Sequence, residues 1–181
     1  TANGDAARRF YSTREAIARD KLAVARPGST VVRGEPEGER LAWAAGAAEV
    51  EVVPGGDSVD LARVAVEAFL GYVVVDAPAR AVALPGRLER RPGEIRDGAH
   101  NPDGVRWLVD RLRPERFTLC VSMLADKDLD AMLAALAELG STLVATSSSS
   151  PRALPARDLA TRAAPLFERV EQVDDPVDAL A

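Results

Sequence analysis

Cysteine and aromatic residues are scarce in this chain of 181 residues. The single cysteine, Cys120, excludes an internal disulfide bond and is typical of proteins in a reducing compartment. It lies in an apolar run, so we expect a small core residue rather than a nucleophile. Aromatic residues make up 4% of the chain, and Ala, Val and Leu supply most of the apolar content. This composition favours alternating strands and small-residue helices over a β-sandwich.

Long apolar runs and clustered basic residues are also missing. No segment approaches the length of a membrane span, and the first residues do not resemble a signal peptide, so we expect a cytoplasmic protein without a membrane partner. The net charge is −5, and no basic stripe is interleaved with aromatic residues, which disfavours a nucleic-acid partner. With 47% hydrophobic residues, the chain can form one packed domain and part of a second.

Helical and extended patterns alternate along the chain, which predicts an α/β fold with a mostly parallel sheet. In the first part, helices are expected from Thr13 to near Gly28, over 40–47 and over 58–70, and strands over 30–32 and 50–53. The helix over 58–70 is rich in Ala and Val, so we expect one of its faces to be buried. Proline and glycine after residue 76 predict a linker, which places the boundary between two domains, 1–76 and 77–181.

Three strand–helix units are predicted in the second domain. They pair a short segment at 93–96 with a helix at 105–112, a strand at 117–123 with a helix at 129–139, and a strand at 142–146 with a helix at 156–167. A last strand is expected at 169–173, followed by the first turn of a helix at 176–180.

The only histidine, His100, lies in the string Asp-Gly-Ala-His-Asn-Pro-Asp-Gly at residues 97–104. Asn101 can cap the helix that follows, and Pro102 suits its first turn because no N–H partner is needed there. A turn of this kind presents backbone N–H groups and the positive end of a helix to an anion such as a phosphate. A well-capped turn whose polar side chains satisfy it locally explains the same residues equally well.

Five segments resemble, in the same order, the folylpolyglutamate synthase / dihydrofolate synthase family of the Mur ligase group. They are a helix with a lysine at 13–21, a Pro-Gly-Arg segment at 84–89, the string at 97–103, an Ala-Asp-Lys-Asp loop at 125–128 and a late loop at 150–156. The resemblance implies a Rossmann-like, mostly parallel sheet flanked by helices in 77–181, preceded by a partial α/β central domain, the remnant of the ATPase domain, in 1–76. It also implies ATP and Mg²⁺ as cofactors.

The resemblance assigns roles to four residues of the second domain and to Ser58 of the first. Arg87 and Asp97 would contact the nucleotide, and Ser58 stands where the family has an asparagine that contacts the base. His100 would lie at the reacting end, near the terminal phosphate or the incoming glutamate, and Arg152 would contact substrate. The reaction implied is phosphorylation of a folate or dihydropteroate carboxylate by MgATP, followed by attack of the glutamate amine on the acyl phosphate.

Lys21 resembles a lysine that the family carbamylates, and the resulting anion could orient a magnesium ion. With His100 and Asp97, it completes the expected catalytic set. From spacing alone, without the resemblance, Lys21 is expected to be an ordinary exposed helical lysine and Arg87 a solvated surface arginine, and Arg152 could simply hold a loop. Trp43 and Trp107 are expected to be half-buried helix residues.

The departures from the family are informative as well. The chain has no Gly-x-x-x-x-Gly-Lys-Ser/Thr string, the loop that cradles phosphates, and Ala6 stands where a metal-binding histidine belongs. Two explanations remain open: a piece of a longer ligase, whose N-terminal ATPase portion would be a partner, or a paralogue whose ATPase half has decayed. We therefore expect a folate-pathway amide ligase that is incomplete as it stands, with little or no turnover in isolation.

Two other functions are kept as alternatives. One is a non-catalytic domain that binds nucleotide weakly or serves as an interaction module, which the missing phosphate loop supports. The other is a fragment of a cell-wall Mur ligase, against which the string at 97–103 argues. Small molecules (folate or dihydropteroate, L-glutamate and ATP) are the expected partners.

Overall fold

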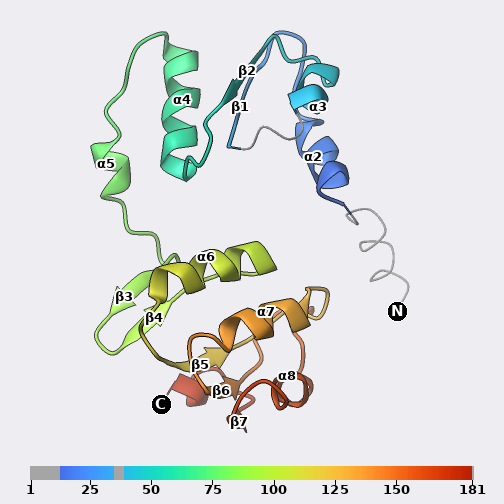
Figure 1. Ribbon diagram of the computed structural model, residues 1–181, viewed down its shortest axis with the longest axis vertical. Coiled ribbons are helices and arrows are strands. Elements are labelled where there is room, and N and C mark those ends of the chain that lie inside the picture. The colour runs from blue at the N-terminus through green and yellow to red at the C-terminus, as the bar shows by residue number, and fades with distance from the viewer. Residues whose placement is uncertain (1–12, 35–38, 181) are drawn as a thin grey trace. The chain divides into compact units, whose positions relative to one another are not determined.

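The computed structural model describes residues 13–34 and 39–180 and divides into two compact units, Thr1–Ala83 and Leu84–Ala181 (Figure 1). We call these unit 1 and unit 2. The division falls after the predicted boundary at residue 76 because Arg80 pairs with Asp57 and Asp76 in the same unit. The interpretation of unit 1 as an ATPase-domain remnant stays a prediction.

Unit 1 is a small α/β arrangement around two parallel strands. Its elements are α2 (Arg14–Leu22), β1 (Thr30–Arg33), α3 (Glu39–Ala44), β2 (Glu49–Val52), α4 (Ser58–Leu70) and α5 (Ala77–Arg80). Strands β1 and β2 pair in parallel, with Thr30 opposite Glu49. Helix α4 packs against β1, and α3 packs against β2 and α2.

Local capping sets where these helices begin. The Thr13 hydroxyl accepts a hydrogen bond from Ala16 N at 3.1 Å, which confirms the predicted start of α2. Asp57 and Asp60 form a reciprocal capping box at the start of α4, and Gly71, with φ of +75°, ends that helix. Helix α2 ends at Leu22, several residues before the predicted end near Gly28.

The expectation of a buried face on α4 is wrong. None of its residues is buried, and Ala42 is the only buried apolar residue of unit 1 among those that the structure describes. A sheet of two strands covers little surface, so most apolar residues of α4 are left in contact with solvent.

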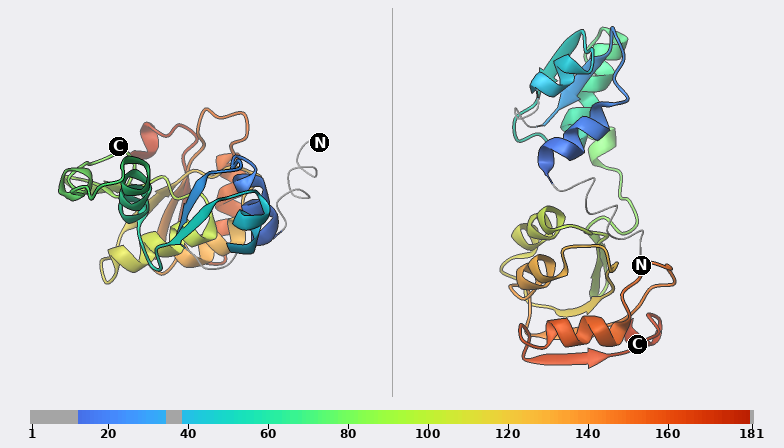
Figure 2. Two further views of the ribbon diagram at one scale, coloured as in Figure 1. Left: turned by 90° about the horizontal axis from the view of Figure 1, so that it is seen from above. Right: turned by 90° about the vertical axis from the view of Figure 1, so that its right-hand side faces the viewer.

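Unit 2 is built on a parallel sheet with the strand order β5-β6-β7. Its elements are β3 (Glu89–Arg91), β4 (Glu94–Arg96), α6 (Pro102–Leu112), β5 (Thr118–Val121), α7 (Leu129–Leu136), β6 (Thr142–Ala145), α8 (Ala156–Ala163), β7 (Arg169–Gln172) and a short 3₁₀ turn, Asp178–Leu180. Helix α6 packs against α7, and α8 lies along β6 and β7 (Figure 2). The mixed α/β fold with a parallel sheet flanked by helices is confirmed.

The first predicted strand–helix unit differs from the prediction. Strand β4 pairs antiparallel with β3, with Arg91 opposite Glu94, rather than joining the parallel sheet. The two residues between the strands are Pro92 and Gly93, and Gly93 has φ of +77°. Proline followed by glycine favours a tight reversal of this kind, so a hairpin forms in front of α6.

The core of unit 2 lies between α6, α7, α8 and β6. Its most completely buried large side chains are Val105, Leu133, Leu139, Leu143 and Leu159. Over the described parts of both units, no helix has the length and apolar character that a membrane crossing requires.

Candidate functional site

Asp97, which directly follows β4, joins two turns of the chain. Its Oδ2 accepts a hydrogen bond from Leu88 N at 2.8 Å, and its Oδ1 accepts one from Ala99 N at 2.7 Å. A third bond runs from Gly98 N to Gly86 O at 2.8 Å. The Pro-Gly-Arg turn and the turn that contains His100 are therefore held together by one carboxylate and one backbone hydrogen bond.

Leu88 has a strained backbone at this junction. Its φ is +45°, the only positive value of a residue other than glycine in the described ranges. A side chain disfavours this conformation, and such outliers cluster at functional sites. The bond from Leu88 N to Asp97 helps to offset the strain. Glu89 stabilises the same turn through Gly86 N, and this bond, with Arg91 nearby, lowers the pKa of Glu89.

Arg87 is exposed beside this junction. Its Nη1 lies 3.5 Å from the point that a Cβ on Gly98 would occupy, so the guanidinium lies close to the second turn. Within the described residues, Arg87 makes no ion pair with a carboxylate. An arginine in this state can donate hydrogen bonds to an anion.

His100 is exposed on the same turn. Its Nδ1 lies 3.0 Å from Gly98 O. A carbonyl oxygen only accepts, so Nδ1 donates and the neutral ring keeps a lone pair on Nε2. Asn101 Oδ1 accepts from Gly104 N at 2.7 Å and caps α6, with Pro102 in the first turn, as predicted.

A second polar cluster joins the loops that follow β5 and β6. Arg152 Nη2 lies 2.5 Å from Asp126 Oδ2, and Arg152 O accepts from Ala125 N at 2.9 Å. Leu154 N donates to Met123 O at 2.8 Å. The hydrogen bond from Arg152 lowers the pKa of Asp126, with a smaller contribution from the charge of Lys127. The loops at 125–128 and 150–156 are thus in contact.

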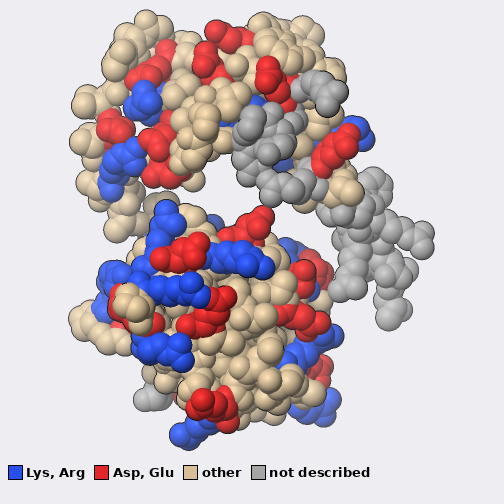
Figure 3. Space-filling view, in the orientation of Figure 1, with Lys and Arg blue, Asp and Glu red and all other residues tan. Residues whose placement is uncertain are grey.

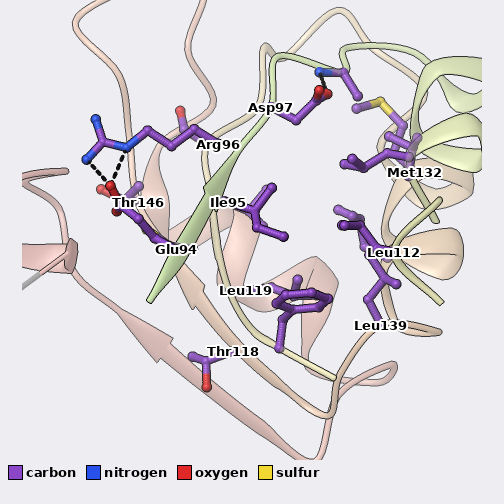
Figure 4. Close-up of a pocket in the computed structure, with 18 of the residues that line it drawn as sticks. Glu94, Ile95, Arg96, Asp97, Leu112, Thr118, Leu119, Met132, Leu139 and Thr146 are labelled. Carbon is purple, nitrogen blue, oxygen red and sulfur yellow. Dashed lines mark hydrogen bonds and ion pairs between the residues drawn. The ribbon is translucent and has the colours of Figure 1, made fainter. Parts of the chain in front are cut away.

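A cavity of about 680 Å³ lies below the first cluster (Figure 4). Asp97, Ser122 and Thr146 line it, and each follows the carboxyl end of a strand: β4, β5 and β6. Apolar side chains such as Ile95, Leu112, Leu119, Met132 and Leu139 form much of the rest. In α/β folds, ligands bind outside the carboxyl ends of strands, so the polar edge around Asp97 is the candidate binding surface.

The predicted site residues fall into three groups. Arg87, Asp97 and His100 meet at the two joined turns, and Arg152 lies with Asp126 on the loops after β5 and β6. Lys21 and Ser58 belong to unit 1.

In unit 1, Ser58 is the first residue of α4 and is exposed, and the N-terminus of that helix is already capped by Asp57. The pKa of Asp57 is lowered, with the hydrogen bond from Asp60 N the largest cause. Lys21 is exposed in the last turn of α2. Neither position makes a contact that tests its expected role, and Ala6 lies outside the described residues.

Nowhere in the described parts of the chain do three or more His, Cys, Asp or Glu side chains gather in a way that could hold a metal ion. Positive and negative side chains of unit 2 are interleaved on the visible face rather than segregated (Figure 3).

Two residues of the site were not singled out from the sequence, and one expectation is wrong. The sequence did not indicate that Asp126 pairs with Arg152, because the two residues are 26 positions apart. Nothing in the sequence around Leu88 indicated a positive φ.

Cys120 was expected in the core, but it is exposed on β5, although partial burial raises the pKa of its thiol. Trp43 and Trp107 are half-exposed on helices, and Arg111 stacks over Trp107.

Comparison with known proteins gives consistent results. The family model for the Mur ligase, glutamate ligase domain, matches residues 86–181. A dihydrofolate synthase/folylpolyglutamate synthase from Mycobacterium tuberculosis is 40% identical in an alignment of 137 positions that covers 66% of this chain and 28% of that protein.

Solved structures show the same likeness. A folylpolyglutamate synthase from Mycobacterium tuberculosis, complexed with ADP, is 29% identical with a TM-score of 0.74, over 92% of this chain and 50% of that one. A bifunctional folylpolyglutamate synthase/dihydrofolate synthase with Mn, AMPPNP and L-glutamate bound is 27% identical with a TM-score of 0.70, over 93% and 50%. This chain thus spans about half the length of the solved relatives.

We expect Asp97→Asn to weaken the joined turns. The amide keeps one acceptor oxygen but turns an NH₂ group toward the other backbone N–H, so the free energy of unfolding of unit 2 should fall by about 1–3 kcal/mol. Amide exchange at Leu88 or Ala99 should quicken. Asp110→Asn, on the exposed side of α6, is the matched control and should change neither. Unchanged exchange at both amides in Asp97→Asn would show that the carboxylate does not hold the turns.

The Asp126–Arg152 pair should make the stability of the fold depend on pH, and the direction of this dependence follows from the pKa of Asp126. Because the pKa of Asp126 lies below its ordinary 3.8, the pair stabilises the fold above that pH, and the contribution is lost as the pH falls through the folded-state pKa. Arg152→Gln should bring the pKa of Asp126 back toward 3.8 in a carboxyl NMR titration. Arg157→Gln, on α8, should leave it unchanged. If the pKa of Asp126 were the same in Arg152→Gln as in the parent chain, the pairing would be contradicted.

Proposed function

The chain belongs to the Mur ligase family through its glutamate ligase domain, and on that premise we propose that it is the C-terminal part of an ATP-dependent ligase of the folate pathway. The whole enzyme would transfer the terminal phosphoryl group of ATP to a carboxylate of dihydropteroate or folate. The amine of L-glutamate would then attack the acyl phosphate, forming an amide and releasing phosphate. Catalysis of this kind depends on positioning and on neutralising phosphate charge.

The observation that carries this proposal is the junction at Asp97. One carboxylate fixes the turn of Arg87 against the turn of His100. Both functional side chains are exposed there, and neither is engaged by a carboxylate among the described residues. A turn that was only structural would not require an exposed arginine and an exposed imidazole on the two segments that it joins.

Each residue of the junction has a distinct expected part. Arg87 would donate charge-assisted hydrogen bonds to the phosphates of the nucleotide. His100, as a neutral imidazole, would accept a hydrogen bond at Nε2 from the ammonium group of glutamate, or it would lie against the terminal phosphate. Asp97 would mainly position the other two, because both of its oxygens already accept backbone N–H groups. Its direct contact with the nucleotide remains a prediction.

Arg152 is proposed to contact a substrate carboxylate. In the structure its guanidinium is bound to Asp126, so a substrate carboxylate would have to share or replace that partner. Ser58 is proposed to lie near the nucleotide base, by its position in the resemblance.

A divalent cation is expected to accompany the nucleotide, because a solved relative contains Mn with AMPPNP. We propose that it is magnesium. The cation would bind mainly to the phosphates of the nucleotide, because Mg²⁺ is usually held by substrate phosphates, waters and one or two carboxylates. Carbamylation of Lys21 would create an additional anionic oxygen ligand in unit 1. The single cysteine and the ATP requirement support a cytoplasmic location for the complete ligase.

A second candidate function is a non-catalytic domain that binds nucleotide weakly. The absence of a phosphate-cradling loop from the 181 residues favours it, since the main donors to the β- and γ-phosphates are then missing. Activity and binding measurements on the same chain separate the two candidates.

Nucleotide binding at the junction should depend on Arg87. In calorimetry with ADP, Arg87→Ala should weaken binding about tenfold, as expected for the loss of one charge-assisted contact. Arg106→Ala, an exposed arginine on α6, is the control and should leave affinity unchanged. Equal affinity for ADP in both variants, or no binding by the parent chain, would argue against a nucleotide site at the junction.

Ligation by the chain alone should be very slow. With folate, L-glutamate and MgATP, we expect turnover far below the range of about 1–10³ s⁻¹ that is usual for enzymes, because the phosphate loop is missing. Release of ADP coupled to formation of glutamylated folate measures it. Turnover in the ordinary range would show that the chain is a complete ligase.

A further inference from the structure

The turn that carries Arg87 is held by a second carboxylate, that of Glu89. Glu89 Oε2 accepts a hydrogen bond from Gly86 N at 2.9 Å. The side chain of Glu89 is 22% exposed, so the bond is partly shielded from water, and hydrogen bonds to a charged group are stronger than neutral ones. Glu89 therefore binds the residue directly before Arg87, whereas Asp97 binds Leu88, the residue directly after it.

Every backbone N–H group of this turn donates a hydrogen bond. Gly86 N donates to Glu89, and Leu88 N donates to the carboxylate that follows β4. Between them, Arg87 N donates to Leu84 O at 3.1 Å. The backbone is thus fixed on both sides of Arg87, although the side chain of this arginine remains exposed.

Glu89 is itself held in place by the hairpin of β3 and β4. Its Oε1 accepts a hydrogen bond from Arg91 Nε at 2.8 Å. The strand register places Glu89 opposite Arg96 and Arg91 opposite Glu94, so four side chains of alternating charge share one face of the hairpin. Arg96 Nε also donates to Glu94 Oε1 at 2.9 Å. Opposite charges across a strand pair stabilise it, and here they fix the direction of the Glu89 carboxylate.

We propose that Glu89 is a positioning residue for nucleotide binding: by holding Gly86 N, it directs the guanidinium of Arg87 toward the phosphates. The inference deepens the proposed function and rests on it for the identity of the ligand. Glu89 does not touch the nucleotide itself, because both of its oxygens already accept hydrogen bonds and a carboxylate repels phosphate charge. A side chain that is held in its bound direction before the ligand arrives lowers the entropic cost of binding.

The first measurement uses the full 181-residue chain without nucleotide. Glu89→Leu keeps much of the bulk but removes the acceptor, so amide exchange at Gly86 should become at least about tenfold faster. The backbone order of Arg87, from ¹⁵N relaxation, should fall. Glu89→Gln retains an acceptor oxygen and should recover most of the protection. The matched control is Glu115→Leu, which removes a carboxylate that pairs with Arg90 of the same hairpin, and it should change neither quantity.

Binding of ADP then separates positioning from a purely structural role. In calorimetry, Glu89→Leu should weaken ADP binding about fivefold in the parent chain, because the direction of Arg87 is no longer fixed. In the Arg87→Ala background it should cause no further loss, since no guanidinium is left to direct. Glu89→Gln should restore most of the affinity. An equal loss with and without Arg87 would assign Glu89 to the stability of the hairpin alone and overturn the proposal.

Arg91→Leu is measured in parallel, so that the test stands even where Glu89→Leu does not fold. It frees Glu89 Oε1 from its partner and should loosen Arg87 to a smaller degree. Arg87 that is as ordered as in the parent chain, in every one of these variants that folds, would overturn the proposal.

The proposed function fails by a different result. If the parent chain does not bind ADP, or if Arg87→Ala binds it equally well, the nucleotide site at the junction is rejected. The relaxation data still decide whether Glu89 orders Arg87, because they are recorded without nucleotide. Conversely, ADP binding that depends on Arg87 but is unchanged in Glu89→Leu would keep the nucleotide site and reject the positioning role.

Discussion

The carboxylate of Asp97 holds two backbone N–H groups, those of Leu88 and Ala99, that belong to different turns of unit 2. One of these turns contains a leucine with a positive φ, a conformation that the isolated segment would rarely adopt. Without the carboxylate, the strained turn would lose one of its two links to the turn of His100, and the backbone bond from Gly98 N to Gly86 O would remain. The carboxylate thus positions the candidate site beside the carboxyl ends of β5 and β6, where Ser122 and Thr146 line the same cavity as Asp97.

The two units differ in how they are stabilised. Unit 2 packs leucine and methionine side chains of α6, α7, α8 and β6 into a continuous core. Unit 1 relies on polar interactions at the surface, including the ion pairs of Arg80 with Asp57 and Asp76. Exposed ion pairs contribute little free energy, so unit 1 gains stability only if its apolar surface is covered. Most of the described apolar core thus belongs to the glutamate ligase domain.

Several local features could be predicted because their causes lie within a few residues. Thr13 and Asn101 cap their helices as expected, since a capping side chain bonds to a backbone N–H only two or three positions ahead. The strands at β1, β5, β6 and β7 follow from short β-branched or apolar runs. The burial of α4 and of Cys120 was predicted wrongly, because burial depends on which other elements are present to cover a face. The periodicity of one helix does not contain that information.

The sequence by itself determined the turn chemistry of residues 97–104 and the membership of the chain in its family. Both could be recognised in short segments, because each motif consists of residues that are neighbours in the sequence. Only the tertiary structure decided that Asp97 fastens Leu88 nine positions away and that Asp126 meets Arg152 across 26 positions. It also placed β4 in a hairpin and left the end of α4 uncovered. Contacts of this kind arise when distant segments are folded against each other, and the geometry that selects one partner among many charged side chains exists only after the core has formed.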